Sequence, residues 1–132
     1  MKIDMKTTTD IGRFGENAAS EYLKKQKYKI VKQNYFASHN EIDIIAENHQ
    51  YIIFVEVKTR TISPNSEFGT PASAVTYAKQ KRTLAAAQSY LNENKIKKSP
   101  RLDVIEVYIS KQNEGAALEV TKINHIEDAF SN

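Results

Sequence analysis

The chain has 132 residues, no cysteine and a formal net charge of +3. This length predicts a single domain, and the absence of cysteine excludes disulfides, thiolate metal sites and cysteine nucleophiles. A chain without cysteine is typical of a reducing compartment, and its longest apolar run, Tyr51–Val55, is too short to cross a bilayer. We therefore expect a cytoplasmic protein without membrane contact, whose small positive charge permits nucleic-acid binding without requiring it.

The N-terminal part of the chain predicts a tail, a helix and three strands. Residues 1–10 are expected to form a flexible tail, and residues 11–132 the domain. Apolar residues at helical spacing predict a helix from Ile11 to about Gln26, with Thr9 or Asp10 as its N-cap. Stretches rich in β-branched and aromatic residues predict strands over Lys29–Phe36, Glu41–Glu47 and Tyr51–Arg60.

The C-terminal part predicts one long helix and at least one more strand. The segment Thr61–Gly69 is expected to be a loop that closes on a substrate, and Thr70-Pro71 is typical of the start of a helix that runs to Asn94. Later elements are expected as a strand over Leu102–Ile109, a turn at Asn113–Gly115, a strand over Leu118–Ile123 and a short helix over His125–Phe130. This order does not alternate strictly, so it predicts an α/β (α+β) fold with a mixed central sheet flanked by helices.

Four charged residues interrupt the apolar pattern of the predicted hairpin: Glu41, Asp43, Glu56 and Lys58. A loop at Asn48-His49 would place Asp43 opposite Phe54 and Glu41 opposite Glu56. Strand side chains alternate between faces, so all four charged side chains would then share one face of the sheet.

These charges need an explanation, because Asp, Glu and Lys are depleted in strands and buried carboxylates are costly to desolvate. Glu41 and Glu56 would repel each other across the hairpin, and a bound cation would reverse that effect. Asp43 and Glu56 supply the oxygen ligands that Mg²⁺ prefers, while Lys58 could stabilise a phosphate or hold an attacking water. The alternative is a half-exposed face of ion pairs, in which Lys58 simply neutralises Glu56.

Other candidate residues lie on the predicted helices and the third strand. Glu16 lies on the flank of the apolar stripe of the first helix and would approach the acids if that helix packs beside the hairpin; the alternative is a surface glutamate. A set of basic side chains could contact phosphates without reading sequence, although each could equally be part of an ordinary solvated surface: Arg60, Lys79, Lys81 and Arg82.

A series of motifs follows in order along the chain: Gly12–Ala19, Asn34-Tyr35, Glu41–Ile45, Phe54–Arg60, Phe68–Pro71, Lys79–Lys81 and Arg101–Ile105. The series resembles the bacterial YraN-like family of predicted endonucleases. That family belongs by fold to the PD-(D/E)XK nuclease superfamily, with the archaeal Holliday-junction resolvases. There are two departures: Ile42 replaces the proline that names the superfamily motif, and Asn40 replaces a glycine, although asparagine tolerates left-handed backbone.

The resemblance implies the order helix, three strands, helix, strand, which is the αβββαβ core of restriction endonucleases. It implies that Asp43, Glu56 and Glu16 ligate the metal and take part in catalysis, and that Lys58 is the catalytic lysine. It also places Lys79 and Gln80 near the site, where we expect Glu41 as well.

The function expected from these implications is a Mg²⁺- or Mn²⁺-dependent endonuclease that hydrolyses phosphodiester bonds in DNA of branched or irregular structure. A fold does not fix a function, so two alternatives stay open. One is a catalytically silent nucleic-acid-binding module that acts with a partner, and the other is a metal-dependent hydrolase of another substrate. Resolvase-like relatives work as homodimers, so a homodimer that pairs two sites is also expected.

Overall fold

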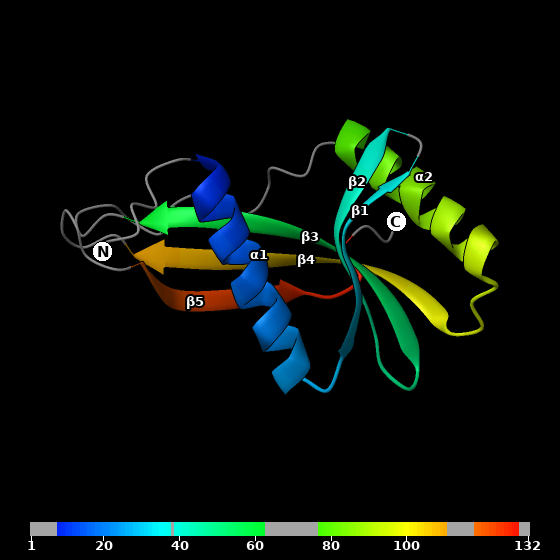
Figure 1. The fold of residues 1–132 in the computed structure, drawn as a ribbon, viewed down its shortest axis with the longest axis horizontal. Coiled ribbons are helices and arrows are strands. Elements are labelled where there is room, and N and C mark those ends of the chain that lie inside the picture. Colours follow the sequence, from blue (N-terminus) through cyan, green and yellow to red (C-terminus); the bar gives the residue numbers. More distant parts are fainter. Residues whose placement is uncertain (1–7, 38, 63–76, 111–117, 130–132) are drawn as a thin grey trace.

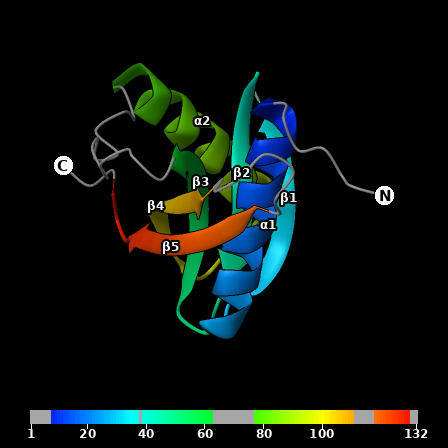
Figure 2. The ribbon, with the colours of Figure 1, turned by 90° about the vertical axis from the view of Figure 1, so that its left-hand side faces the viewer.

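The structure, a computed structural model, describes residues 8–37, 39–62, 77–110 and 118–129. These residues form a five-stranded mixed sheet and two helices (Figure 1, Figure 2). The elements are α1 (Thr8–Lys25), β1 (Lys29–Ala37), β2 (Asn40–Glu47), β3 (Tyr51–Ile62), α2 (Tyr77–Asn94), β4 (Ser99–Ser110) and β5 (Glu119–Ile126). The predicted fold class is therefore confirmed.

The strands of the described sheet lie in the order β1-β2-β3-β4-β5. β3 and β4 pair in parallel, and the other neighbouring strands pair antiparallel. A parallel pair needs a long crossover between its strands, and α2 lies in the segment that connects β3 to β4. None of the described helices is long and apolar enough to span a membrane.

Two hydrophobic cores cover the two faces of the sheet. Ile53 and Val55 of β3 pack with Leu23 of α1, whereas Ile52 and Phe54 pack with residues of α2. This division follows from the alternation of strand side chains, and it explains why β3 is a continuous apolar run: both of its faces are covered. The side of α2 that faces the sheet consists of Thr83, Ala86, Ala87 and Tyr90.

Two local predictions are wrong. α1 begins at Thr8, so Thr9 and Asp10 lie inside the helix and neither is its N-cap. No terminal helix forms at His125, because this residue pairs with Ile105 in the β4–β5 ladder and residues 127–129 form a turn. The predicted tail up to residue 7, the helix start at residues 70 and 71, most of the loop over residues 61–69 and the turn at residues 113–115 lie outside the described residues.

The predicted register of the β2–β3 hairpin is also wrong, by two residues. Phe54 pairs with Ile45 and not with Asp43, and the next pair is Ile44 with Val55. Asn48 is the reason: its Oδ1 accepts hydrogen bonds from the backbone N–H groups of residues 50 and 51 (2.9 and 2.7 Å). Such an Asx turn centres the loop one residue later than Asn48-His49.

The side chains of β2 change faces close to Asp43. Ile42 and Ile44 would share a face in a regular strand, but Ile42 packs in the core beside α2 and Ile44 in the core beside α1. The β2–β3 pairing ends at Ile44–Val55, while the β1–β2 pairing continues to Ala37–Asn40. Figure 1 shows β1 and β2 turning away from β3 and β4. Asp43 therefore lies at the point where the two halves of the sheet separate.

His39, which directly precedes β2, is left-handed, with φ of 63°. Asn40, which replaces the glycine of the related motif, is the first residue of β2 and is not left-handed. The left-handed conformation before β2 therefore forms without a glycine.

Candidate metal centre

Because β2 separates from β3, a backbone N–H group of β3 has no strand partner and donates its hydrogen bond to a side chain instead. Val57 N donates a hydrogen bond of 2.8 Å to Asp43 Oδ2. The Asp43 carboxylate thus replaces the main-chain partner that a continuing ladder would supply. This hydrogen bond fixes the carboxylate between the two diverging strands.

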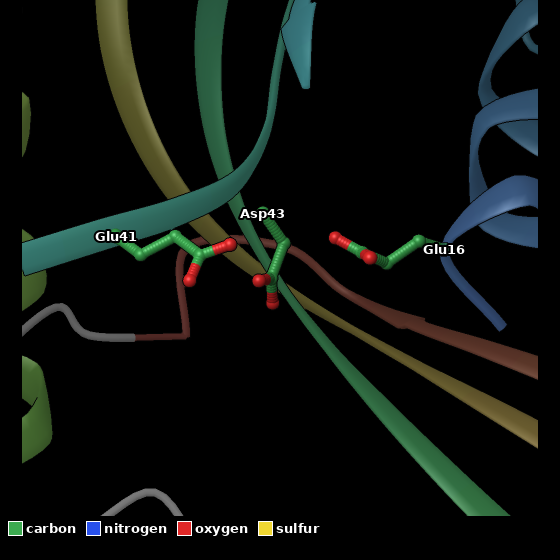
Figure 3. A group of neighbouring side chains, drawn as sticks. All are labelled: Glu16, Glu41 and Asp43. Carbon is green, nitrogen blue, oxygen red and sulfur yellow. The ribbon is translucent and has the colours of Figure 1, made fainter. Parts of the chain in front are cut away.

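Three carboxylates meet at this point. Glu16 of α1, Glu41 of β2 and Asp43 each offer an oxygen, and these oxygens lie within 4.8 Å of one another. Glu16 and Glu41 point toward Asp43 from opposite sides (Figure 3). Carboxylate oxygens are the ligands that hard divalent cations such as Mg²⁺ take. Glu41, expected from the sequence only beside the site, is a full member of this group.

α1 reaches the site through a close approach to β3. Gly15 is buried, and a Cβ at this position would overlap the hydroxyl oxygen of Thr59 and lie 3.0 Å from its Cβ. Only a glycine allows this spacing without a shift of the helix. The next residue, Glu16, is consequently held close to the sheet.

Burial and neighbouring carboxylates raise the pKa of two of these acids, Asp43 and Glu16. Burial and the negative charge of Glu56 raise the pKa of Asp43 to about 7, with smaller contributions from Glu16 and Glu41, although the hydrogen bond from Val57 N opposes them. Burial, Glu41 and Glu56 also raise the pKa of Glu16, against a lowering effect of Arg13. Negative charges that repel one another favour a bound cation.

Glu56 lies next to this group, on the side of α2. It is 5% exposed, and its Oε1 lies 3.5 Å from both Lys58 Nζ and Lys79 Nζ. Its Oε2 is buried and has no hydrogen-bond partner in the part of the chain that the structure describes. A buried acceptor without a partner is rare in folded proteins, and a cation held beside Asp43 would satisfy it. The residues present therefore fit Mg²⁺ or Mn²⁺.

The four charged residues of the hairpin do not share one face, contrary to the prediction. Glu41 and Asp43 gather with Glu16 from α1, whereas Glu56 and Lys58 form ion pairs beside Lys79 of α2. The two groups meet where β2 leaves β3, so the site is assembled across the sheet and not on one side of it.

The remaining candidates lie around Glu56 or further away. Lys79 Nζ lies 3.5 Å from Glu56 Oε1, and its neighbour Gln80 is half-buried on α2. Arg60 Nε lies 4.0 Å from Glu106 Oε2, and its Nε and Nη2 are buried without hydrogen-bond partners among the described residues. Lys81 and Arg82 are exposed on α2.

Sequence reasoning assigned no role to Asn34, which the structure places at the site. When its side-chain amide is oriented toward the acids, Asn34 Nδ2 donates to Glu41 Oε1 (2.8 Å) and to Glu16 Oε1 (2.9 Å). An asparagine inside a predicted strand is a weak indication of a functional role, because asparagine is disfavoured in strands.

A second buried acid, Asp103 of β4, has different surroundings. Arg101 donates to both of its oxygens (2.9 Å each), His125 Nε2 lies 2.7 Å from Oδ2, and Asp128 N donates to Oδ1 (3.0 Å). Burial alone would raise the pKa of Asp103, but these hydrogen bonds outweigh it and hold the pKa below its usual value. Tyr22 of α1 also contacts the ring of His125, so this network ties α1, β4 and β5 together and leaves no oxygen of Asp103 without a partner.

Comparison with known proteins places the chain in a family. The model of the uncharacterised protein family UPF0102 matches residues 15–107, which include all the acidic residues of the candidate metal centre. The chain belongs to the UPF0102 family. This confirms the resemblance to the YraN-like proteins at the level of the family.

UPF0102 proteins from several bacteria match nearly the whole chain. The protein of Caldanaerobacter subterraneus subsp. tengcongensis is 41% identical over 130 residues, which cover 98% of each chain. The protein of Chloroherpeton thalassium is 41% identical and covers 96% of this chain and 97% of its own. The protein of Alkaliphilus oremlandii is 43% identical over 91% of this chain and 97% of its own. The family relationship thus includes both helices and the whole described sheet.

Proposed function

We propose that this UPF0102 protein is a divalent-metal-dependent nuclease that hydrolyses phosphodiester bonds in DNA of branched or irregular structure. The observation that carries the proposal is the buried Glu56 Oε2, which has no hydrogen-bond partner among the described residues and lies beside the point where Glu16, Glu41 and Asp43 converge. Folding alone gives no reason to bury an acid in this way. The element order α1-β1-β2-β3-α2-β4 agrees with the core of the PD-(D/E)XK superfamily, which supports the assignment.

The acids would hold Mg²⁺ or Mn²⁺. Asp43 is the central ligand in this proposal, with Glu56 on one side and Glu16 and Glu41 on the other. When bound, the cation supplies Lewis-acid chemistry: it makes water more acidic and neutralises negative charge on a phosphate. The hydrogen bond from Val57 N keeps Asp43 Oδ2 in place.

The lysines would act on the phosphate. Lys58 and Lys79 both neutralise Glu56 in ion pairs of 3.5 Å. A cation that takes over Glu56 would free their charge for a phosphate oxygen in the same place, where charge builds up during hydrolysis. Lys58 is half-buried beside the acids, so we assign it the catalytic role. Arg60, Lys79, Lys81 and Arg82 would contact neighbouring phosphates.

Cleavage of a panel of labelled DNAs with Mg²⁺ or Mn²⁺ tests the proposal. The panel contains a single strand, a duplex, a flap, a fork and a four-way junction, and the wild type is compared with Asp43→Asn and Lys58→Ala. We expect cleavage of at least one irregular DNA by the wild type and none by either variant. Glu21→Gln is the matched control, because Glu21 is an exposed acid of α1 that pairs with Lys24, and it should cleave normally.

The opposite outcomes are equally informative. Cleavage that survives both substitutions belongs to a contaminant and removes the nuclease assignment. Metal-independent DNA binding that weakens with salt, without cleavage of any substrate, would replace it with the nucleic-acid-binding module.

A further inference from the structure

Asn34 has a backbone conformation that few residues adopt within a strand. Its φ is 53°, in the left-handed region that asparagine tolerates better than most side chains. It lies in β1 between Gln33, which pairs with Ile44, and Tyr35, which pairs with Ile42. That register places Asn34 beside Asp43. Sparsely populated conformations are retained where the surrounding structure demands them, often at functional sites.

The left-handed conformation turns the Asn34 side chain toward α1. Gln33 donates a hydrogen bond to Ser20 of α1, and Asn34 donates to Glu16, one helical turn away on the same face of the helix. Consecutive side chains of a regular strand point to opposite faces, so both could not reach one helix. The break in regularity at Asn34 allows both contacts.

The amide of Asn34 joins two acids that come from different elements. One nitrogen carries two N–H donors, and these reach Glu16 Oε1 of α1 at 2.9 Å and Glu41 Oε1 of β2 at 2.8 Å. Without this bridge the two like charges would separate, because Glu41 is exposed and free to turn into solvent. Each carboxylate keeps its second oxygen for another partner.

We propose that Asn34 is a positioning residue of the metal centre, whose amide holds the Glu16 and Glu41 carboxylates in place around a divalent cation at Asp43. The inference rests on the metal centre of the proposed function and adds a residue to it. Asn34 does not ligate the cation. Partners that orient metal ligands in this way typically change metal affinity 10–100-fold when they are removed.

The test measures the dissociation constant for Mn²⁺ from the electron paramagnetic resonance signal of the free ion. The wild type is compared with Asn34→Gly, since glycine adopts the left-handed backbone without strain and lacks the side chain that carries the amide. Because Asn34 is exposed, we expect the low end of the range, a dissociation constant raised about tenfold.

Gln33→Ala is the matched control. It removes the neighbouring contact between β1 and α1, the hydrogen bond to Ser20, and leaves the acids untouched. Its thermal stability should fall about as much as that of Asn34→Gly, while its affinity for Mn²⁺ stays at the wild-type value. If Asn34→Gly does not fold, Asn34→Ser gives the same test, because a serine hydroxyl is too short to bridge both carboxylates.

The two proposals fail in different ways. A wild type that does not bind Mn²⁺ overturns the metal centre and, with it, the positioning role. A wild type that binds Mn²⁺ as tightly as the Asn34→Gly variant overturns the positioning role alone. A loss of affinity in Gln33→Ala equal to that in Asn34→Gly would also overturn it, since any loosening of α1 would then be sufficient.

Discussion

Asp43 and Asp103 are acids of two strands in the same sheet, but their neighbours shift their pKa values in opposite directions. Asp103 accepts hydrogen bonds from Arg101, His125 and the backbone of Asp128. In the described part of the chain, Asp43 accepts one hydrogen bond, from Val57 N, and the charged neighbours that shift its pKa, Glu56, Glu16 and Glu41, are all acids. The pKa of Asp103 is lowered and that of Asp43 is raised to about 7. The partners of Asp103 are those expected of an acid that stabilises the fold, whereas the like charges around Asp43 leave it available to a positively charged ligand.

The two acids also respond to pH in opposite directions. Asp43 binds its proton more tightly in the folded chain, so its ionisation costs stability as the pH rises from the ordinary aspartate pKa of 3.8 toward about 7. Asp103 has a lowered pKa, so its contribution is present above 3.8 and is lost as the pH falls through the folded value. Substitutions at the two positions should separate these effects.

The largest expected effect is that of Asp103→Ala. It leaves the buried Arg101, whose side chain is 10% exposed, without its main partner, and breaking a buried pair in this way costs about 3–5 kcal/mol. Urea unfolding at neutral pH measures the loss. A loss below about 1 kcal/mol, the value of an exposed pair, would show that the network contributes no more than a surface ion pair.

A divalent cation should stabilise the protein through Asp43 and not through Asp103. At a Mn²⁺ concentration 100 times the dissociation constant, the free energy of unfolding should rise by about 2.7 kcal/mol. The rise should disappear in Asp43→Asn and persist in Arg101→Lys, which alters the other network. Thermal unfolding with and without Mn²⁺ measures it, and equal stabilisation of wild type and Asp43→Asn would place the cation elsewhere.

Asp43→Asn should stabilise the metal-free protein, unlike most substitutions of half-buried polar residues. The amide keeps an acceptor for Val57 N and removes the charge that Glu56 and Glu16 repel. We expect a gain of about 1–3 kcal/mol near pH 8, since one pKa unit corresponds to about 1.4 kcal/mol. The gain should vanish below about pH 4, where the aspartate is protonated in both states. Glu47→Gln, in an ion pair of β2 with Lys98, is the control and should show no gain.

The smallest expected effect is that of Gly15→Ala, which moves Glu16 without altering any charge. The added methyl overlaps Thr59 and costs about 1–3 kcal/mol. Replacing a helical glycine by alanine stabilises the helix by about 1 kcal/mol. The net loss in the free energy of unfolding is therefore about 0–2 kcal/mol. Affinity for Mn²⁺ should nevertheless fall, because Glu16 moves away from Asp43. The double variant Gly15→Ala/Thr59→Ala removes the Thr59 hydroxyl that the new methyl overlaps, so it should recover part of the affinity. An unchanged affinity in Gly15→Ala would mean that the position of Glu16 does not matter.

Much of the fold could be predicted because it depends on local patterns. The apolar spacing after Ile11 and the β-branched runs of β2, β3 and β4 determine the elements and their order. The side of α2 that faces the sheet could not be predicted, because its small residues do not form a single stripe. The register of the hairpin was missed since it depends on the side chain of Asn48, and the terminal helix since His125 is held by Asp103 and Tyr22 from distant segments.

The site was predictable only as a set of residues and not as an arrangement. The acids of β2 and β3 stand out because they interrupt apolar strands. The change of face near Asp43 and the placement of Glu41 beside Glu16 follow from the separation of β2 from β3, and no alternating pattern encodes that. The contacts of Asn34 with the acids could not be predicted for the same reason. They require a left-handed backbone, and an asparagine in a sequence does not by itself predict that conformation.

The irregular backbone of β1 also disfavours the pairing of this strand with a strand of another molecule. β1 is an edge of the described sheet, and an edge strand offers unpaired backbone groups to which another chain can add. Here the pairing shifts between Ile30 and Lys32, and Asn34 is left-handed. A strand bent at two places is a poor template for a straight partner, and the exposed lysines at positions 29 and 32 repel a second copy. The same asparagine that would order the acids therefore also helps to prevent edge-to-edge aggregation.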